Sequence, residues 1–111
     1  MEAPLIQEIS AEQFLDKVIV PQTDALIKVS TTWNGAGQML HFTLYELSQK
    51  YSDKLNFYFI NQDLNAEISI QYQVEAVPTL LFFKKGTLVD KLSGLNHRNA
   101  IEEKINKIVN S

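Results

Sequence analysis

Val77-Pro78-Thr79-Leu80-Leu81-Phe82-Phe83-Lys84-Lys85-Gly86 is the segment from which the architecture of this chain is predicted. Leu80–Phe83 are continuously apolar, which predicts that residues 79–84 form a strand buried on both faces. Lys85-Gly86 is typical of a hairpin turn, so residues 87–93 should return as an antiparallel strand. A strand buried on both faces needs a helix layer above and below its sheet.

Three more strands and four helices are predicted around this hairpin. Apolar runs indicate strands at 5–9, 25–30 and 55–61, and residues 67–72 read as a short helix. Three further helices are indicated by apolar stripes, formed by Phe14, Leu15, Val18 and Ile19, by Leu40, Leu44, Leu47 and Tyr51, and by Ile101, Ile105, Ile108 and Val109. The order β-α-β-α-β-α-β-β-α predicts an α/β fold with three layers, α/β/α, and a mixed central sheet of about five strands flanked by four helices.

Two helix starts carry capping signals. Ser10 and Gln13 have the spacing of a capping box, in which each side chain accepts a hydrogen bond from the backbone N–H of the other residue. Asn96 is the expected N-cap of the last helix, because asparagine accepts hydrogen bonds from the free N–H groups of a first turn. Pro21 is expected to end the first helix.

The composition limits the classes of function. The chain has 111 residues with 45% hydrophobic residues, which fits a single domain over residues 1–111. Its formal net charge of −3 argues against a nucleic-acid partner, and it has no apolar run of membrane-spanning length. No signal peptide is visible at the N-terminus, so a cytoplasmic protein is expected. His41 and His97 are isolated and are expected at the surface, so no metal site and no cofactor is predicted.

Four features, in order and at matching spacing, resemble the thioredoxin family over essentially the whole chain. They are Trp33 and Gly35 in the loop after the second strand, the cis-proline-like Val77-Pro78-Thr79, the hairpin Phe82–Gly86, and Ser93-Gly94 before the last helix. The resemblance implies a thioredoxin-like fold.

The departures from the family pattern concentrate where its chemistry would be. The resemblance places Asn34 and Gly37 at the two active-site cysteine positions, and the chain has no cysteine at all. Thiol–disulfide exchange needs a thiolate to attack and a second sulfur to resolve the mixed disulfide. The family's buried aspartate falls at Lys28, and the lysine that often faces it falls at Phe59. Asn34 is interpreted mainly as a helix N-cap, with a hydrogen bond to a partner's backbone as the alternative.

A peptide groove of the family type needs no cysteine. In the family, the residue before the cis-proline presents its backbone to an extended peptide, a short form of strand addition; here that residue is Val77. The predicted groove consists of Trp33, Asn34, Gly35, Ala36, Ala76, Val77, Pro78, Ser93, Gly94 and Leu95. The first hypothesis is therefore a redox-inactive binding or chaperone-like accessory module whose partner is a protein or an extended peptide. The persistence of Pro78 for the turn alone is the alternative reading of this segment.

Lys28 supports an alternative hypothesis from another class. It lies between Ile27 and Val29 on a strand expected at the centre of the sheet, where an unpaired ammonium is costly. It should therefore be paired, neutral or, as the main expectation, extended to the surface. An enzyme without thiol chemistry, using Lys28 as an amine of low pKa or the helix N-terminus, is the alternative. No second catalytic group is evident beside Lys28 in the sequence. A third reading is that only homology, and no oxidoreductase activity, links the chain to thioredoxin.

Overall fold

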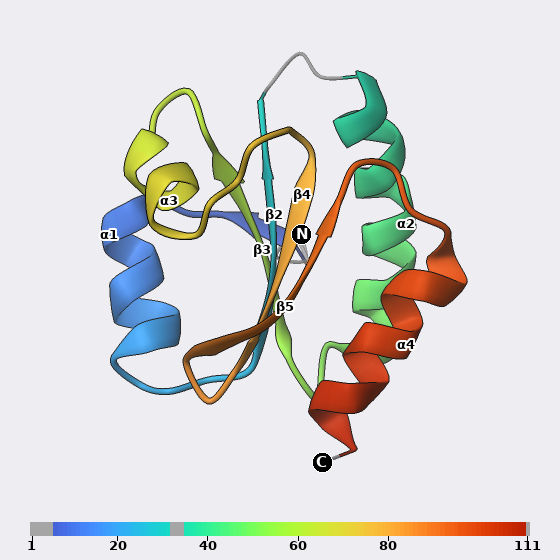
Figure 1. Cartoon of the computed structure of the whole chain (residues 1–111). Helices are drawn as coiled ribbons and strands as arrows, with labels where there is room; N and C mark the ends of the chain where they lie inside the picture. The colour runs from blue at the N-terminus through green and yellow to red at the C-terminus, as the bar shows by residue number, and fades with distance from the viewer. Residues whose placement is uncertain (1–5, 32–34, 111) are drawn as a thin grey trace, which may run out of the picture.

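The computed structural model describes residues 6–31 and 35–110. In these residues the elements follow the predicted order (Figure 1). They are β1 (Ile6–Glu8), α1 (Ala11–Phe14), the π-helical turn η1 (Leu15–Ile19), β2 (Ala25–Ser30), α2 (Gly35–Tyr51), β3 (Asn56–Asn61), α3 (Ala66–Gln71), β4 (Thr79–Lys84), β5 (Thr87–Ser93) and α4 (Arg98–Val109).

The five strands form one mixed sheet in the order β1-β3-β2-β4-β5. β1, β3 and β2 run parallel, whereas β4 is antiparallel to β2 and pairs with β5 as the predicted hairpin. Helices cover both faces, with α1 and α3 on one side and α2 and α4 on the other (Figure 1). This is the predicted three-layer α/β/α architecture.

Each face of the sheet has its own hydrophobic core. On the side of α2 and α4, Leu26, Leu40, Phe82 and Ile105 belong to one cluster of buried residues. On the side of α1 and α3, a second cluster of buried residues contains Phe14, Ile27, Ile68, Leu81 and Phe83. Successive side chains of a strand point to opposite faces, so β2 and β4 contribute alternately to both cores. The continuous apolar runs of these strands follow from this double burial.

The capping box of α1 is confirmed. The Ser10 hydroxyl accepts from the Gln13 backbone N–H at 3.1 Å, and the Gln13 carboxamide oxygen accepts from the Ser10 N–H at 2.9 Å. The apolar stripe of this segment is only partly buried, because Leu15 remains half exposed. Leu15 is the first residue of the turn η1, in which Val18 is the buried residue.

The predicted N-cap of the last helix is wrong. α4 begins at Arg98 with His97 as its N-cap residue, and His97 makes no side-chain capping bond. The Asn96 amide instead donates to the carbonyl groups of Ser93 and Gly94 at 3.0 and 3.2 Å. Asn96 therefore closes the turn that leaves β5 and is not available to cap the helix.

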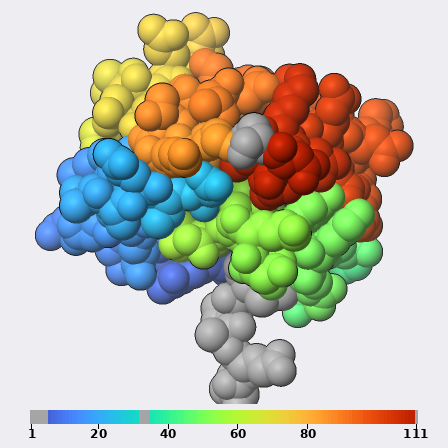
Figure 2. Space-filling model, turned by 90° about the horizontal axis from the view of Figure 1, so that it is seen from below, coloured from blue at the N-terminus to red at the C-terminus, as the bar shows by residue number. Residues whose placement is uncertain are grey.

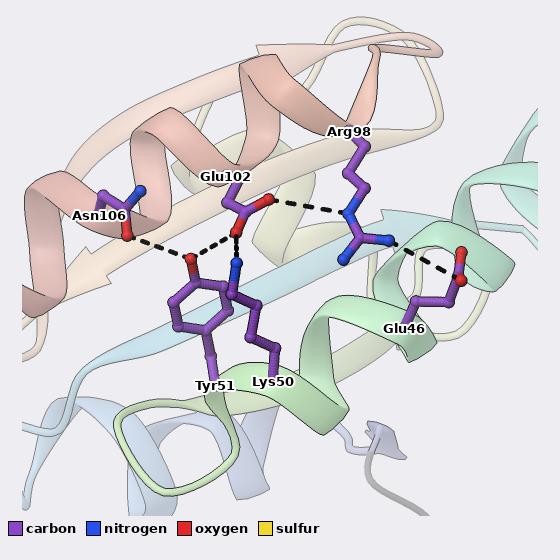
Figure 3. A network of polar contacts seen from close by, with 6 residues as sticks. All are labelled: Glu46, Lys50, Tyr51, Arg98, Glu102 and Asn106. Carbon is purple, nitrogen blue, oxygen red and sulfur yellow. Dashed lines mark hydrogen bonds and ion pairs between the residues drawn. The ribbon is translucent and has the colours of Figure 1, made fainter.

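A polar network joins α2 to α4 (Figure 3). Glu102 on α4 accepts from the Lys50 ammonium and, at 2.6 Å, from the Tyr51 hydroxyl at the C-terminal end of α2. Arg98 lies 3.7 Å from the Glu102 carboxylate and 3.8 Å from that of Glu46. The network fixes α2 against α4, with Tyr51 as its buried member.

The end of the molecule seen from below brings three connections together (Figure 2). They are the segment before β2, the segment between α2 and β3, and the β4–β5 turn. The backbone carbonyl of Thr23 accepts from the Gly86 N–H at 3.0 Å, and that of Asp24 accepts from the Asn56 N–H at 3.1 Å.

Within the described residues, none of the helices is both long and apolar enough to cross a membrane.

Candidate functional site

The sheet brings three connections to one of its edges. In the strand register, Val29 of β2 pairs with Thr79 of β4, and Thr79 pairs with Ser93 of β5. The end of β2, the start of β4 and the end of β5 are therefore neighbours. The Gly94 N–H donates to the Pro78 carbonyl at 2.7 Å, which ties the segment after β5 to the segment before β4.

The segment before β4 is held in a defined shape. The Val77–Pro78 peptide bond is cis, and Pro78 is buried. The Thr79 hydroxyl donates to the Ala76 carbonyl at 2.6 Å, which closes the turn around the proline. Ala76 itself is exposed. The turn therefore places the exposed residue Ala76 close to a buried proline ring.

Glycine keeps the surface open at two of the predicted groove positions. Gly94 has a φ of +80°, which disfavours any residue with a Cβ, and a Cβ built there would meet nothing within 4 Å. A Cβ built on Gly35, at the start of α2, would also meet nothing within 4 Å. Leu95 follows with 54% of its surface exposed. Space is therefore free for a ligand above both glycines.

Eight of the ten predicted groove residues lie within the described part of the chain. The strand register and the hydrogen bond from Gly94 to Pro78 bring four of them together, namely Val77, Pro78, Ser93 and Gly94. Gly35 and Ala36 open α2, which follows β2 at the same edge of the sheet. Trp33 and Asn34 lie outside the described residues.

Lys28 lies beneath this edge and does not reach the surface as expected. Only 5% of the residue is exposed, because β2 is the central strand and α2 passes over it. Its ammonium donates to the Gly37 carbonyl at 3.2 Å and lies 3.0 Å from Nδ1 of His41. The ammonium is also 4.7 Å from the centre of the Phe59 ring, a cation–π contact. Lys28 is thus paired inside the protein.

Burial changes the titration of both partners. Desolvation lowers the pKa of Lys28 from 10.5 to about 8. The pKa of His41 is lowered by its burial and by the positive charge of Lys28. A charged Lys28 can only donate, so Nδ1 of His41 accepts and the neutral imidazole carries its proton on Nε2.

His41 is the residue that sequence reasoning missed. It is partly buried, contrary to the surface position expected for it, and it supplies the second polar group beside Lys28. Gly37 and His41 are four residues apart, so both contacts of the ammonium come from one face of α2. That spacing was the available signal, but it did not reveal which face covers β2.

Lys28 and Phe59 are direct neighbours across β2 and β3. By the resemblance described above, these are the two positions where the family has a buried aspartate and a facing lysine. Here the cation has moved to the central strand and the opposite position has become aromatic. The acid that would handle protons beneath a thiol is therefore replaced by a base.

The described residues contain no group of three His, Asp or Glu side chains able to hold a metal ion. The chain has no cysteine, so it can form neither a thiolate nor a disulfide. The chemistry that remains at this edge is backbone hydrogen bonding, apolar contact at Leu95, and the buried amine of Lys28.

The comparisons with known proteins agree with this architecture. Residues 5–107 match the thioredoxin family, and the chain therefore belongs to that family. Its sequence is 27% identical to a chloroplastic M-type thioredoxin of Pisum sativum over 94% of this chain and 60% of that protein. It is 25% identical to a thioredoxin of Rickettsia prowazekii over 95% of this chain and 100% of that protein.

Solved thioredoxin structures show the same fold. The thioredoxin of Malassezia sympodialis superposes with a TM-score of 0.85 at 24% identity, covering 98% of this chain and 95% of that one. The thioredoxin of Trypanosoma brucei brucei gives a TM-score of 0.86 at 18% identity, covering 99% and 96%. This chain spans only 54–60% of the length of the chloroplastic M-type thioredoxins of Pisum sativum, Arabidopsis thaliana and Spinacia oleracea.

Proposed function

We propose that this thioredoxin-family chain is a redox-inactive module that holds an extended segment of a partner protein. The partner would lie in the groove formed by the start of α2, the turn at Ala76–Pro78 and the segment Ser93–Leu95. The single observation that carries the proposal is the hydrogen bond of 2.7 Å from the Gly94 N–H to the Pro78 carbonyl. It joins two groove segments at one edge of the sheet.

The surface of this groove suits a backbone better than a reacting group. Glycine at positions 35 and 94 leaves space where a Cβ would meet nothing within 4 Å. Leu95 adds an exposed apolar contact beside exposed Ala76. A short added strand gains affinity from main-chain hydrogen bonds and specificity from such side contacts. None of these interactions requires sulfur.

Affinity capture from the native host tests the proposal. The bait is the wild-type chain, and a Gly35→Leu, Leu95→Ser double variant fills the free space and removes the apolar contact. Val20→Ser is the matched control, because Val20 is also an exposed apolar residue but belongs to the turn before β2. The captured partner is then titrated against all three proteins by calorimetry.

The proposal is supported if the partner binds the double variant at least about tenfold more weakly than the wild type and binds Val20→Ser as tightly as the wild type. Equal binding to all three proteins would place the interface on another face and contradict the proposal. Circular dichroism and urea unfolding of each variant show whether the fold is intact, so a lost interaction can be separated from lost structure.

The Lys28–His41 pair favours a second candidate function, an enzyme that uses an amine. A pKa of about 8 leaves part of the Lys28 population neutral and nucleophilic near neutral pH. Its burial opposes access by a substrate. Labelling with a carbonyl reagent and borohydride tests this candidate, with exposed Lys54 as the internal reference. Faster labelling of Lys28 than of Lys54 would support an enzymatic function, and slower labelling would exclude this candidate.

The cytoplasm remains the proposed compartment. The relatives include chloroplastic and mitochondrial thioredoxins, so homology alone does not choose among compartments. Cell fractionation with an antibody against the chain tests the proposal, and recovery in an organelle or outside the cell would contradict it.

A further inference from the structure

The face of the molecule away from α2 and α4 carries an apolar hollow between two helices. A cavity of about 270 Å³ lies between α1 and α3, with Phe14 and Ile68 among its lining residues. Leu15 and Gln71 also line it, and Glu12 and Glu67 stand at it from opposite helices. It shares no residue with the groove of Pro78 and Gly94.

The two walls of this hollow are fixed before anything binds. The Ala11 N–H donates to the Asn65 side chain at 2.9 Å, which joins the start of α1 to the start of α3. Beyond them, the Phe14 and Tyr72 rings pack edge to face with centroids 5.8 Å apart, and both contact Phe83. A preformed site spends little free energy on ordering its own walls.

Large apolar side chains stand exposed on the same layer. Ile70 on α3 is 78% exposed, and Leu64, just before α3, is 74% exposed. Leu64 also lines a neighbouring hollow of about 410 Å³ together with Glu8, Ser10 and Gln13 of the β1–α1 segment. Exposed apolar residues gathered at hollows are typical of an interaction surface.

This layer also concentrates negative charge. Residues 6–20 and 61–75 contain six carboxylates and a single ammonium, a formal net charge of −5 in a chain whose total is −3. The carboxylates are Glu8, Glu12, Asp16, Asp63, Glu67 and Glu75, and the ammonium is that of Lys17.

None of these six carboxylates forms an ion pair within the described part of the chain. Across residues 6–31 and 35–110, every ion pair joins residues of β5, α2 and α4, and none includes these six. Lys91 reaches this side but donates to the Tyr72 and Gln73 carbonyls past the end of α3. The charge of the layer is therefore available to a ligand of opposite sign.

From this combination we propose that the hollow between α1 and α3 is a docking site for a basic amphipathic segment of another protein. A large apolar side chain of that segment would enter the cavity against Phe14 and Ile68. Flanking lysine or arginine side chains would lie over Glu12 and Glu67. This is the helix-in-groove mode of recognition, with charge selecting the partner.

A second copy of the chain is a poorer occupant. The basic residues Arg98, Lys104 and Lys107 lie on α4, but in the described residues this helix exposes no large apolar side chain. Lys104 is also already paired with Asp90 at 2.7 Å. Helix α4 therefore offers charge without a side chain to fill the hollow. Helix α2 offers the opposite, because it exposes Met39 and Phe42 but has a single lysine, Lys50, which is already paired with Glu102.

The test uses a fluorescein-labelled synthetic peptide of three Lys-Leu-Phe-Lys repeats, titrated with the whole protein and followed by anisotropy. Glu12→Gln, Glu67→Gln removes the two charges at the hollow. Glu103→Gln, Asp53→Asn removes two exposed charges elsewhere and is the matched control. A peptide with glutamate in place of lysine tests the sign of the charge.

We expect the first double variant to bind the lysine peptide about five- to tenfold more weakly, and the control variant to match the wild type. Binding should also weaken as salt rises from about 0.05 to about 0.3 M. Amide shift changes in ¹⁵N spectra should centre on residues 11–15 and 67–71.

Four outcomes of the peptide titrations and spectra would overturn the proposal. They are no binding of the lysine peptide, equal binding of the glutamate peptide, equal loss in both double variants, and shift changes centred on another face. Sedimentation of the protein alone is measured as well. A dimer that the Glu12→Gln, Glu67→Gln variant dissociates would assign the hollow to a second copy and would also overturn the proposal. Each variant's unfolding curve is measured first, so that a folding defect is not mistaken for lost binding.

Discussion

At the scale of single residues, Lys28 is where this chain departs furthest from an ordinary core. A charged amine on the central strand is desolvated, and its partners are a carbonyl, a neutral imidazole and a ring, none of them an anion. Such a group lowers the stability of the folded state whenever it is protonated, because water solvates the ammonium better in the unfolded chain.

The pH dependence of stability should reveal this cost. The folded-state pKa of Lys28 is about 8 and its ordinary value is 10.5, so between these values the unfolded chain binds more protons. Stability therefore rises with pH through this window. In Lys28→Met this rise should be absent. Urea unfolding at pH about 7 and about 9.5 measures it, and an equal change in wild type and variant would contradict the assignment.

His41 should act in the acid range by the same reasoning. The folded-state pKa of His41 lies below the ordinary value of 6.5, so the unfolded state takes up a proton first as the pH falls. The folded state therefore loses stability as the pH falls below about 6.5. We expect His41→Asn to lose less stability than the wild type between pH about 7 and about 5. His97→Asn changes an exposed histidine and should follow the wild type. Identical curves for all three proteins would refute this role of His41.

At the scale of elements, the start of α1 was fully predictable because a capping box is local. Ser10 and Gln13 are three residues apart and satisfy each other without help from the rest of the fold. The start of α4 was mispredicted because Asn96 has a competing use, and its amide bonds the carbonyls of the preceding turn. A residue type with several local hydrogen-bonding options does not identify by itself the option that the tertiary structure selects.

Removing the cap of α1 should therefore have a defined cost. Ser10→Ala leaves the Gln13 N–H without its side-chain acceptor and should lower the free energy of unfolding by about 1 kcal/mol. Ser52→Ala, in the exposed turn after α2, should change it by less than about 0.5 kcal/mol. Equal effects of the two substitutions in urea unfolding would show that the cap contributes nothing.

The network between α2 and α4 gives a second comparison at this scale. Tyr51→Phe removes the hydroxyl that donates to Glu102 at 2.6 Å and should cost about 0.5–1.5 kcal/mol. Lys50→Ala removes a solvent-exposed ammonium from the same carboxylate and should cost less stability than Tyr51→Phe, because water screens an exposed ion pair. A larger loss of unfolding free energy for Lys50→Ala than for Tyr51→Phe would reverse the assigned order.

At the scale of the whole molecule, hydrophobic periodicity was enough to predict the strands and the three layers. The segment Leu80–Phe83 is apolar without interruption because β4 is covered on both faces, and this pattern is visible without coordinates. The Lys28–His41 contact and the hollow between α1 and α3 were not predictable in this way. Both depend on how helices sit on the sheet, and residues far apart in sequence meet there only through packing.

The absence of cysteine is also a property of the whole chain and gives the broadest prediction. With no thiol in its 111 residues, the protein should leave insulin reduction by dithiothreitol at the rate seen without protein. Its thermal midpoint should be the same with and without dithiothreitol, because no disulfide can be reduced. A thioredoxin with both active-site cysteines is the positive control for the first assay. Insulin-reducing turnover that survives repurification, or a thermal midpoint that moves with reductant, would contradict the proposal that this chain is redox-inactive.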